Sequence, residues 1–142
     1  MSRKSLPVAA ALAVCLVAAG CGSSSSSSST ASSTTAAAQA GTTVGGVQLF
    51  KVTSPATGAM QYNPSTLTAK AGKVTITYTN LGPIAHNIAI FDAKRHELGT
   101  EMDPFAKGSK KTTATLKAGT YTYECQVAGH AAAGMKGTIV VS

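Results

Sequence analysis

The sequence predicts an all-β fold, a β-sandwich of about seven to eight strands, on three observations. From residue 44 onward, short runs rich in Val, Ile, Thr and Tyr alternate apolar and polar side chains. Such alternation is typical of half-buried antiparallel strands. Gly- and Pro-containing turns separate the runs at short intervals. The same region lacks the apolar period of a long helix, so helical folds are not favoured.

The chain begins with an export signal that precedes the predicted fold. Residues 1–20 start with the positive pair Arg3 and Lys4 and continue as an apolar stretch too short to span a bilayer. The small residues before Cys21 resemble a bacterial lipobox, in which the cysteine carries the lipid. The alternative is ordinary signal cleavage, with Cys21 incidental. We predict a lipoprotein-type signal peptide, and a mature chain anchored at Cys21 to the bacterial cell membrane, facing the periplasm or the exterior.

Residues 21–43 are predicted to be a flexible linker. Seven consecutive serines, Ser23 to Ser29, are followed by Thr, Ala and Gly, which cannot bury enough apolar surface to fold. A flexible coil of this length has its ends about 25 Å apart on average. The linker is either a leash that lets an anchored domain sample nearby partners or a bare spacer.

Residues 44–142 are predicted to form the folded domain. Its expected strands are Val47–Val52, Leu67–Lys70, Lys73–Asn80, His86–Asp92, Thr112–Leu116, Thr120–Cys125 and Gly137–Val141. The alternation is strictest in Lys73–Asn80, where Val74, Ile76 and Tyr78 share the face predicted to be buried. The segment between Asp92 and Gly108 is polar and irregular, with room for a short helical turn.

Positive charge exceeds negative charge, with Lys+Arg 12 against Asp+Glu 5. The lysines are dispersed among apolar and Thr residues. They form either an ordinary solvated surface or one that steers the protein toward an acidic redox partner or an anionic membrane face. No basic helix and no row of aromatic residues for stacking is present, so nucleic-acid binding is not predicted.

A thiol, an imidazole and a thioether follow one another in Cys125, His130 and Met135, with four residues between each pair. A further imidazole, His86, lies upstream at the head of an apolar run. Each residue alone has a structural explanation, as a core cysteine, a structural histidine or a packing methionine. Together, two His, one Cys and one Met make the ligand set of a mononuclear copper electron-transfer site.

Cysteine usage agrees with a metal site. The signal contains Cys15, the lipid would occupy Cys21, and Cys125 is then the only thiol in the domain, so no internal disulfide can form. A lone thiol in an exported protein is open to oxidation unless it is used, and metal ligation uses it. The thiolate suits Cu(I), and imidazoles suit both copper oxidation states. Because His86 comes from another strand, the site requires the folded sandwich.

These motifs identify a resemblance. Tyr123-Glu124-Cys125, Gly129-His130, Gly134-Met135-Lys136-Gly137 and His86-Asn87 resemble the cupredoxins, the blue copper family that includes plastocyanin, azurin, auracyanin and halocyanin. The resemblance covers residues 44–142 and implies a Greek-key sandwich. It implies His86, Cys125 and His130 as strong equatorial ligands and Met135 as the axial ligand of one copper ion. It also implies that Asn87 pins the ligand loop by hydrogen bonds. The Cys-to-His spacing of four residues exceeds that usual in plastocyanins and is nearer to auracyanin- or rusticyanin-like proteins.

The resemblance also implies a docking patch around the exposed imidazole edge. Small or apolar residues flank both histidines: Pro83, Ile84, Ala131, Ala132 and Ala133. The alternative is ordinary turn composition. The implied function is a monomeric electron carrier, not an enzyme, which shuttles single electrons between redox partners such as cytochromes or membrane oxidoreductase complexes. The competing function is copper storage or delivery, which usually favours exposed Met/His-rich or paired-Cys sites.

Overall fold

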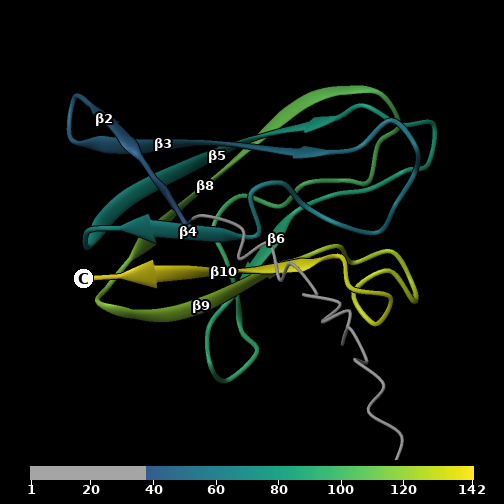
Figure 1. Cartoon of the computed structure of the whole chain (residues 1–142). Coiled ribbons are helices and arrows are strands. Elements are labelled where there is room, and N and C mark those ends of the chain that lie inside the picture. The colour runs from purple at the N-terminus through teal and green to yellow at the C-terminus, as the bar shows by residue number, and fades with distance from the viewer. Residues whose placement is uncertain (1–37) are drawn as a thin grey trace, which may run out of the picture. The chain divides into compact units, whose positions relative to one another are not determined.

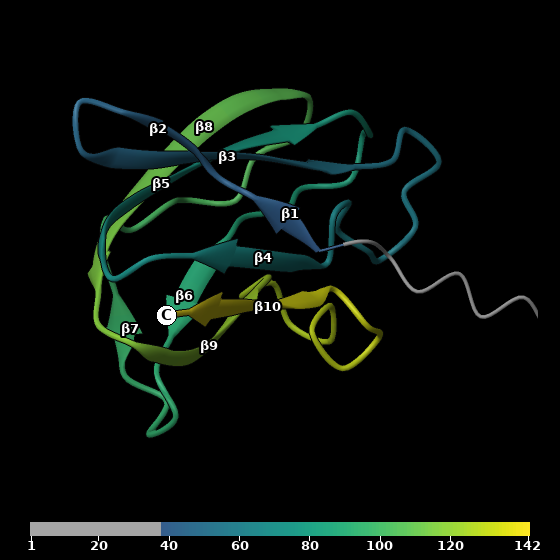
Figure 2. The same ribbon diagram turned by 60° about the vertical axis from the view of Figure 1, so that its left-hand side comes forward.

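Two β-sheets pack face to face in the computed structural model, which describes residues 38–142 (Figures 1 and 2). The predicted signal peptide, the lipidation site Cys21 and most of the predicted linker lie outside the described residues. Within residues 38–142, no helix has the length and apolar character needed to cross a bilayer.

The larger sheet has six strands and the smaller sheet has four. In spatial order the larger sheet contains β1 (Gln39–Ala40), β4 (Thr66–Ala69), β10 (Lys136–Val141), β9 (Gly119–Glu124), β6 (Ala89–Phe91) and β7 (Glu97–Leu98). The smaller sheet contains β2 (Thr42–Val44), β3 (Val47–Ser54), β5 (Gly72–Asn80) and β8 (Gly108–Leu116). The chain crosses from one sheet to the other between β1 and β2, β3 and β4, β4 and β5, β5 and β6, β7 and β8, and β8 and β9. The predicted all-β sandwich is confirmed.

The core lies between the sheets and follows the predicted alternation. In β5, Val74, Ile76 and Tyr78 are completely buried, and the threonines between them face outward. Tyr123 of β9 is buried, and Cys125, the first residue after β9, is buried on the same side. Residues 38–142 thus contain a complete two-sheet hydrophobic core, as expected of a domain that folds on its own.

The end of the predicted linker is part of the sandwich. Residues 39–40 and 42–44 form β1 and β2, which pair with β4 and β3. Between them Gly41 lies against the ring of Phe50, so close that a Cβ atom there would be 2.6 Å from the ring. These short strands have no apolar period of their own. β1 is fixed by pairing with the distant β4, whereas β2 folds back on β3 through the turn at Gly45-Gly46.

Two predicted segments differ from the structure. His86–Asp92 was expected to be one strand, but only Ala89–Phe91 pairs as a strand, and His86 instead forms an isolated bridge with Phe105. Between Asp92 and Gly108 the structure has β7 and no helical turn. Here the side chain of Asp92 accepts hydrogen bonds from the backbone N–H groups of Lys94 and His96, at 2.8 and 2.9 Å. These bonds close a side-chain turn where a helical turn was expected.

Candidate metal centre

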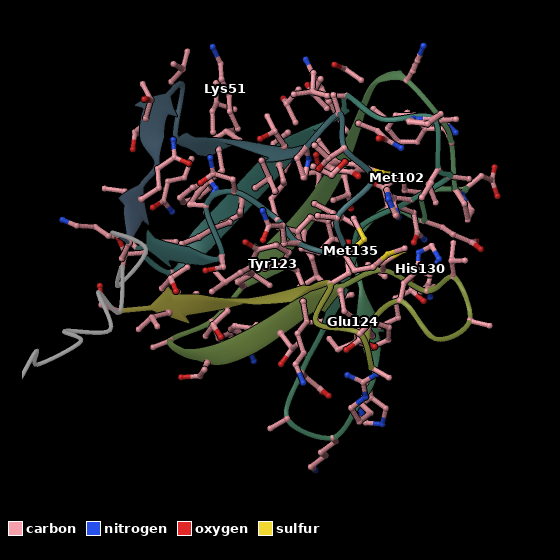
Figure 3. The ribbon with its side chains drawn as sticks, turned by 45° about the vertical axis from the view of Figure 1, so that its right-hand side comes forward. Lys51, Met102, Tyr123, Glu124, His130 and Met135 are labelled. Carbon is pink, nitrogen blue, oxygen red and sulfur yellow. The ribbon has the colours of Figure 1, made fainter. Side chains whose placement is uncertain are left out.

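The loop between β9 and β10 is closed at its base by the two sulfur-containing residues. Cys125 directly follows β9, Met135 directly precedes β10, and the Cys125 N–H donates to the Met135 carbonyl at 3.1 Å. Inside the loop, the Met135 N–H donates to the His130 carbonyl at 3.0 Å. Gly129 and Gly134 adopt φ of 83° and 109°, which favours glycine at both turns. The loop lies at one end of the sandwich, with His130 and Met135 next to each other (Figure 3).

The ligand atoms of His86, Cys125 and His130 form a small triangle. The two Nδ1 atoms are 3.0 Å apart, and Cys125 Sγ is 3.5 Å from His130 Nδ1 and 4.0 Å from His86 Nδ1. Metal–nitrogen and metal–sulfur distances of about 2.0 and 2.3 Å in a trigonal plane require separations of about 3.5 and 3.8 Å. The triangle is therefore close to the size needed to hold one metal ion, with the two nitrogen atoms somewhat nearer to each other than in a metal-bound site.

The surroundings of the triangle favour metal binding over protonation. His86 and Cys125 are each 1% exposed, whereas His130 is half-buried. Burial, followed by repulsion from the neighbouring His130 ring, lowers the pKa of His86 below its ordinary value of 6.5. A neutral imidazole is the form that binds a metal ion, so this site keeps His86 ready to bind. Cys125 is a free thiol, without a disulfide partner among the described residues.

Met135 belongs to the same buried cluster as Cys125 and is completely buried. Met135 directly precedes β10, so it lies at the base of the loop that also carries Cys125 and His130. A thioether beside a His, Cys, His triangle is the donor set of a copper electron-transfer site, in which the sulfur of methionine interacts weakly with the metal.

Asn87 connects the segment of His86 with the segment of Cys125. Its side-chain carbonyl accepts from the Gln126 N–H at 2.8 Å, and its amide donates to Gln126 Oε1 at 2.8 Å and to the Met102 carbonyl at 2.9 Å. Asn87 is 1% exposed, so these bonds are shielded from water. They tie the residue after one histidine of the triangle to the residue after its cysteine.

Four residues that sequence reasoning missed also support the site. Asn80 donates to the carbonyls of Ile84 and Phe105, at 2.8 and 2.7 Å, and thereby holds the segment before His86. Tyr62 donates to the Asn87 carbonyl, and Gln126 donates to Glu97 at 2.7 Å. Asn80 gave a weak signal, as an amide directly before the Leu81-Gly82-Pro83 turn. Nothing in the sequence distinguished Tyr62, Phe105 or Gln126.

The residues of the expected docking patch lie at the same end of the sandwich. Pro83, Ile84, Ala132 and Ala133 are exposed, and Ala131 is half-buried. A third segment joins them, because a Cβ on Gly58 would be 2.8 Å from Ile84, and a Cβ on Gly134 would be 3.5 Å from the Met60 carbonyl. The residues next to His130 in the loop and those just before His86 are thus uncharged.

Glu124, next to Cys125, faces the opposite side of the sheet. Its carboxylate pairs with the Arg95 guanidinium at 2.5 and 3.1 Å, and Arg95 lies 4.3 Å over the Phe91 ring. Glu124 is therefore neutralised within its own sheet.

A β-sandwich with this buried triangle defines a single-metal protein of the blue copper class. Residues 50–142 match the family described as copper binding proteins of the plastocyanin/azurin family, and the chain belongs to that family. Its cofactor is copper. Its class is that of electron carriers rather than enzymes, which agrees with the prediction from sequence.

Individual relatives support the same family assignment. The chain is 37% identical to the plastocyanin of Scenedesmus fuscus over 91 residues, which cover 59% of this chain and 89% of that protein. Two chloroplastic plastocyanins match over only 60% of their length. Among solved structures, auracyanin A, a blue copper protein of Chloroflexus aurantiacus, has a TM-score of 0.59 at 23% identity, covering 68% of this chain and all of auracyanin A (100%). Reduced rusticyanin has a TM-score of 0.57 at 25% identity, covering 72% of this chain and 84% of rusticyanin.

Proposed function

We propose that this protein is a lipid-anchored electron carrier at the outer face of a bacterial membrane, with His86, Cys125, His130 and Met135 as the copper ligands. The observation that carries the ligand assignment is the triangle of two Nδ1 atoms and one Sγ atom, which fits one metal ion. Copper bound there supplies one-electron redox chemistry. The protein keeps the ligands in one arrangement, excludes water from His86 and Cys125, and leaves His130 half-buried at the surface.

The route for the electron follows from this exposure. His130 is the most exposed member of the triangle and lies among Pro83, Ile84, Ala132 and Ala133, none of which is charged. An uncharged patch of small residues allows a partner to approach closely without desolvating charges. We propose that redox proteins such as cytochromes or membrane oxidoreductase complexes dock there.

A docking test compares two single substitutions in the copper-loaded domain. Ala132→Glu places a charge in the patch, whereas Ala118→Glu places the same charge in the exposed turn between β8 and β9. Electron transfer with a soluble c-type cytochrome, followed by stopped-flow absorption, should slow at least about tenfold only in Ala132→Glu, because burying an unpaired charge costs more than about 1.4 kcal/mol. Equal rates in both variants would remove the patch from the proposal.

The lipid anchor is tested in the full-length chain. Cells producing the wild type and Cys21→Ser are given radioactive palmitate, and membranes are separated from soluble protein. We expect label and membrane association in the wild type only. If the wild-type protein carries no label, the lipid anchor is wrong, and the proposal is reduced to an exported electron carrier.

The competing function, copper storage or delivery, predicts easy release of the metal. The reduced protein is titrated with a weak Cu(I) chelator. Because three of the four proposed ligands, His86, Cys125 and Met135, are shielded from water, we expect copper to be retained. Ready loss of copper would favour delivery.

A further inference from the structure

The outer face of the smaller sheet combines lysines with hydroxyl groups. Lys51, Thr77 and Lys111 lie opposite one another on β3, β5 and β8. Lys73, also on β5, lies opposite Val47 of β3. The other outward positions are mainly Thr and Ser. Two pairs of these hydroxyls hydrogen-bond across the strands, Thr75 with Thr113 at 2.9 Å and Thr79 with Ser109 at 2.7 Å. We call the outward side chains of β3, β5 and β8 the basic face.

No ion pair among the described residues neutralises the lysines of the basic face, although Glu101 and Asp103 belong to the segment beside β8, where the Thr100 N–H donates to the Thr113 carbonyl at 3.0 Å. The chain has five carboxylate side chains, and none of them lies in β2, β3, β5 or β8. In the larger sheet and its loops, by contrast, Glu124 pairs with Arg95, and Asp92 contacts His96. Lys51, Lys73 and Lys111 are exposed, and in the described part of the chain they form no ion pair.

The basic face has a regular spacing. Strands in a sheet lie about 4.8 Å apart, so Lys51 and Lys111, on either side of β5, are separated by about 10 Å at their Cα atoms. Lys110, although adjacent in sequence, turns the other way, over the Phe105 ring at 5.1 Å. The three lysines of the basic face therefore reach outward from a surface of short hydroxyl side chains.

We propose that the basic face lies on the anionic phospholipid headgroups of the membrane to which the protein is attached, an inference that rests on the membrane attachment in the proposed function. Lysines are strongly hydrated point charges without the fixed geometry of arginine, and they suit a diffuse anionic surface. The chain enters the domain through β1 and β2, and β2 is the edge strand of this same sheet. A tether to the bilayer would therefore join the domain at β1, the edge strand of the larger sheet, which Gly41 alone separates from β2.

This orientation leaves the copper end accessible. The metal-site residues lie beside β6, β9 and β10, all in the other sheet. Figure 3 shows Lys51 on the opposite layer from His130 and Met135. With the basic face on the headgroups, the docking patch at the end of the sandwich would point along the membrane, toward partners in the same bilayer.

The test measures vesicle binding by the unlipidated domain, residues 38–142, which contains the complete core. Sedimentation with phosphatidylglycerol vesicles is compared with phosphatidylcholine vesicles at low salt. We expect binding to the anionic vesicles only, lost on adding salt. Because each lysine near an anionic surface contributes about fivefold in binding, the double variant Lys51→Glu/Lys111→Glu should bind at least tenfold more weakly.

The control variant Lys94→Glu/Lys117→Glu changes the net charge equally but outside the basic face, and its binding should fall less than threefold. Retention of the visible copper band shows that each variant is folded. Absence of binding to anionic vesicles, or equal weakening in both double variants, would overturn the inference. Either outcome leaves the electron carrier and the Cys21 anchor standing, since the domain tested carries no lipid.

Discussion

The two sheets of this sandwich are built in different ways. The smaller sheet contains three long strands, β3, β5 and β8, of 8, 9 and 9 residues. The strands of the larger sheet that border the metal site are shorter, with 3 residues in β6 and 6 each in β9 and β10. The residues proposed as ligands all lie just outside those shorter strands.

The difference shows where side chains, in place of neighbouring strands, form hydrogen bonds with the backbone. In long strands the backbone groups pair with one another, so the side chains are left to fill the core or face the solvent. At the ends of the short strands many backbone groups have no ladder partner. Asn87 and Tyr62 bond to them instead, and Asn80, the last residue of β5, bonds to the segment before His86. We therefore expect changes in the middle of the smaller sheet to alter stability, and changes at the strand ends near the metal site to alter that site.

The largest effect should come from the thiol. Cys125→Ser should abolish the intense visible thiolate-to-copper absorption band completely, because serine supplies no soft sulfur donor. The measurement is an absorption spectrum after addition of Cu(II), with circular dichroism to verify folding. A band that persists in this variant would contradict the ligand assignment.

A core substitution in the smaller sheet should separate stability from metal binding. Ile76→Ala removes a completely buried side chain from the middle of β5 and should lower the free energy of unfolding by about 2–5 kcal/mol. The copper band should keep its position. Denaturant titration measures the first effect, and the outward-facing Thr77→Ala, expected to cost less than about 0.5 kcal/mol, is the matched control. A shifted band in Ile76→Ala would break the separation between the two sheets.

Removing the connection between His86 and Cys125 segments should weaken metal binding without abolishing it. Asn87→Ala deletes the bonds to Gln126 and Met102, and residues of this kind change metal affinity by about 10- to 100-fold. Competition with a chelator of known affinity measures the change. The exposed Gln61→Ala serves as the control. Equal affinities for both variants would show that the loop holds its shape without Asn87.

Acid should destabilise the metal-free protein through His86. Its pKa is lowered in the folded state, so below its ordinary value of 6.5 the unfolded chain binds a proton that the folded chain resists. The free energy of unfolding should therefore fall as pH drops below 6.5 toward the folded-state pKa. Urea titrations of the metal-free protein at several pH values measure the slope. The slope should be shallower in His86→Gln, and a slope as steep as that of the wild type would assign it to other groups.

The smallest effect should come from the outermost bond of the site. Glu97→Ala removes the exposed carboxylate that accepts a hydrogen bond from the Gln126 side chain. Exposed hydrogen bonds contribute little, so copper affinity should change less than about threefold, below about 0.7 kcal/mol. The same chelator competition measures it. A loss as large as that of Asn87→Ala would mean that Glu97 holds the loop as firmly as the buried amide.

Sequence patterns predicted well the parts of the fold that repeat. The alternation in β5 placed Val74, Ile76 and Tyr78 in the core, where they are completely buried. Irregular parts were not predicted: β1 and β2 were assigned to the linker, and His86 was assigned to a strand that begins only at Ala89. β1 and the His86 segment are fixed by pairing with distant residues, as in the bridge of His86 to Phe105, and leave no local pattern. β2 instead folds back on the neighbouring β3 through Gly45-Gly46, and its residues show no apolar alternation.

The sequence by itself determined the kinds of donor atom and the alternation of buried residues, because both depend on residue type and spacing along the chain. Tertiary structure alone decided that His86 and His130, 44 residues apart, bring their Nδ1 atoms to 3.0 Å. It also decided which amides hold the loop, and that Lys51, Lys73 and Lys111 share one face of the smaller sheet. These features arise from the packing of the two sheets, which joins segments that no local pattern relates.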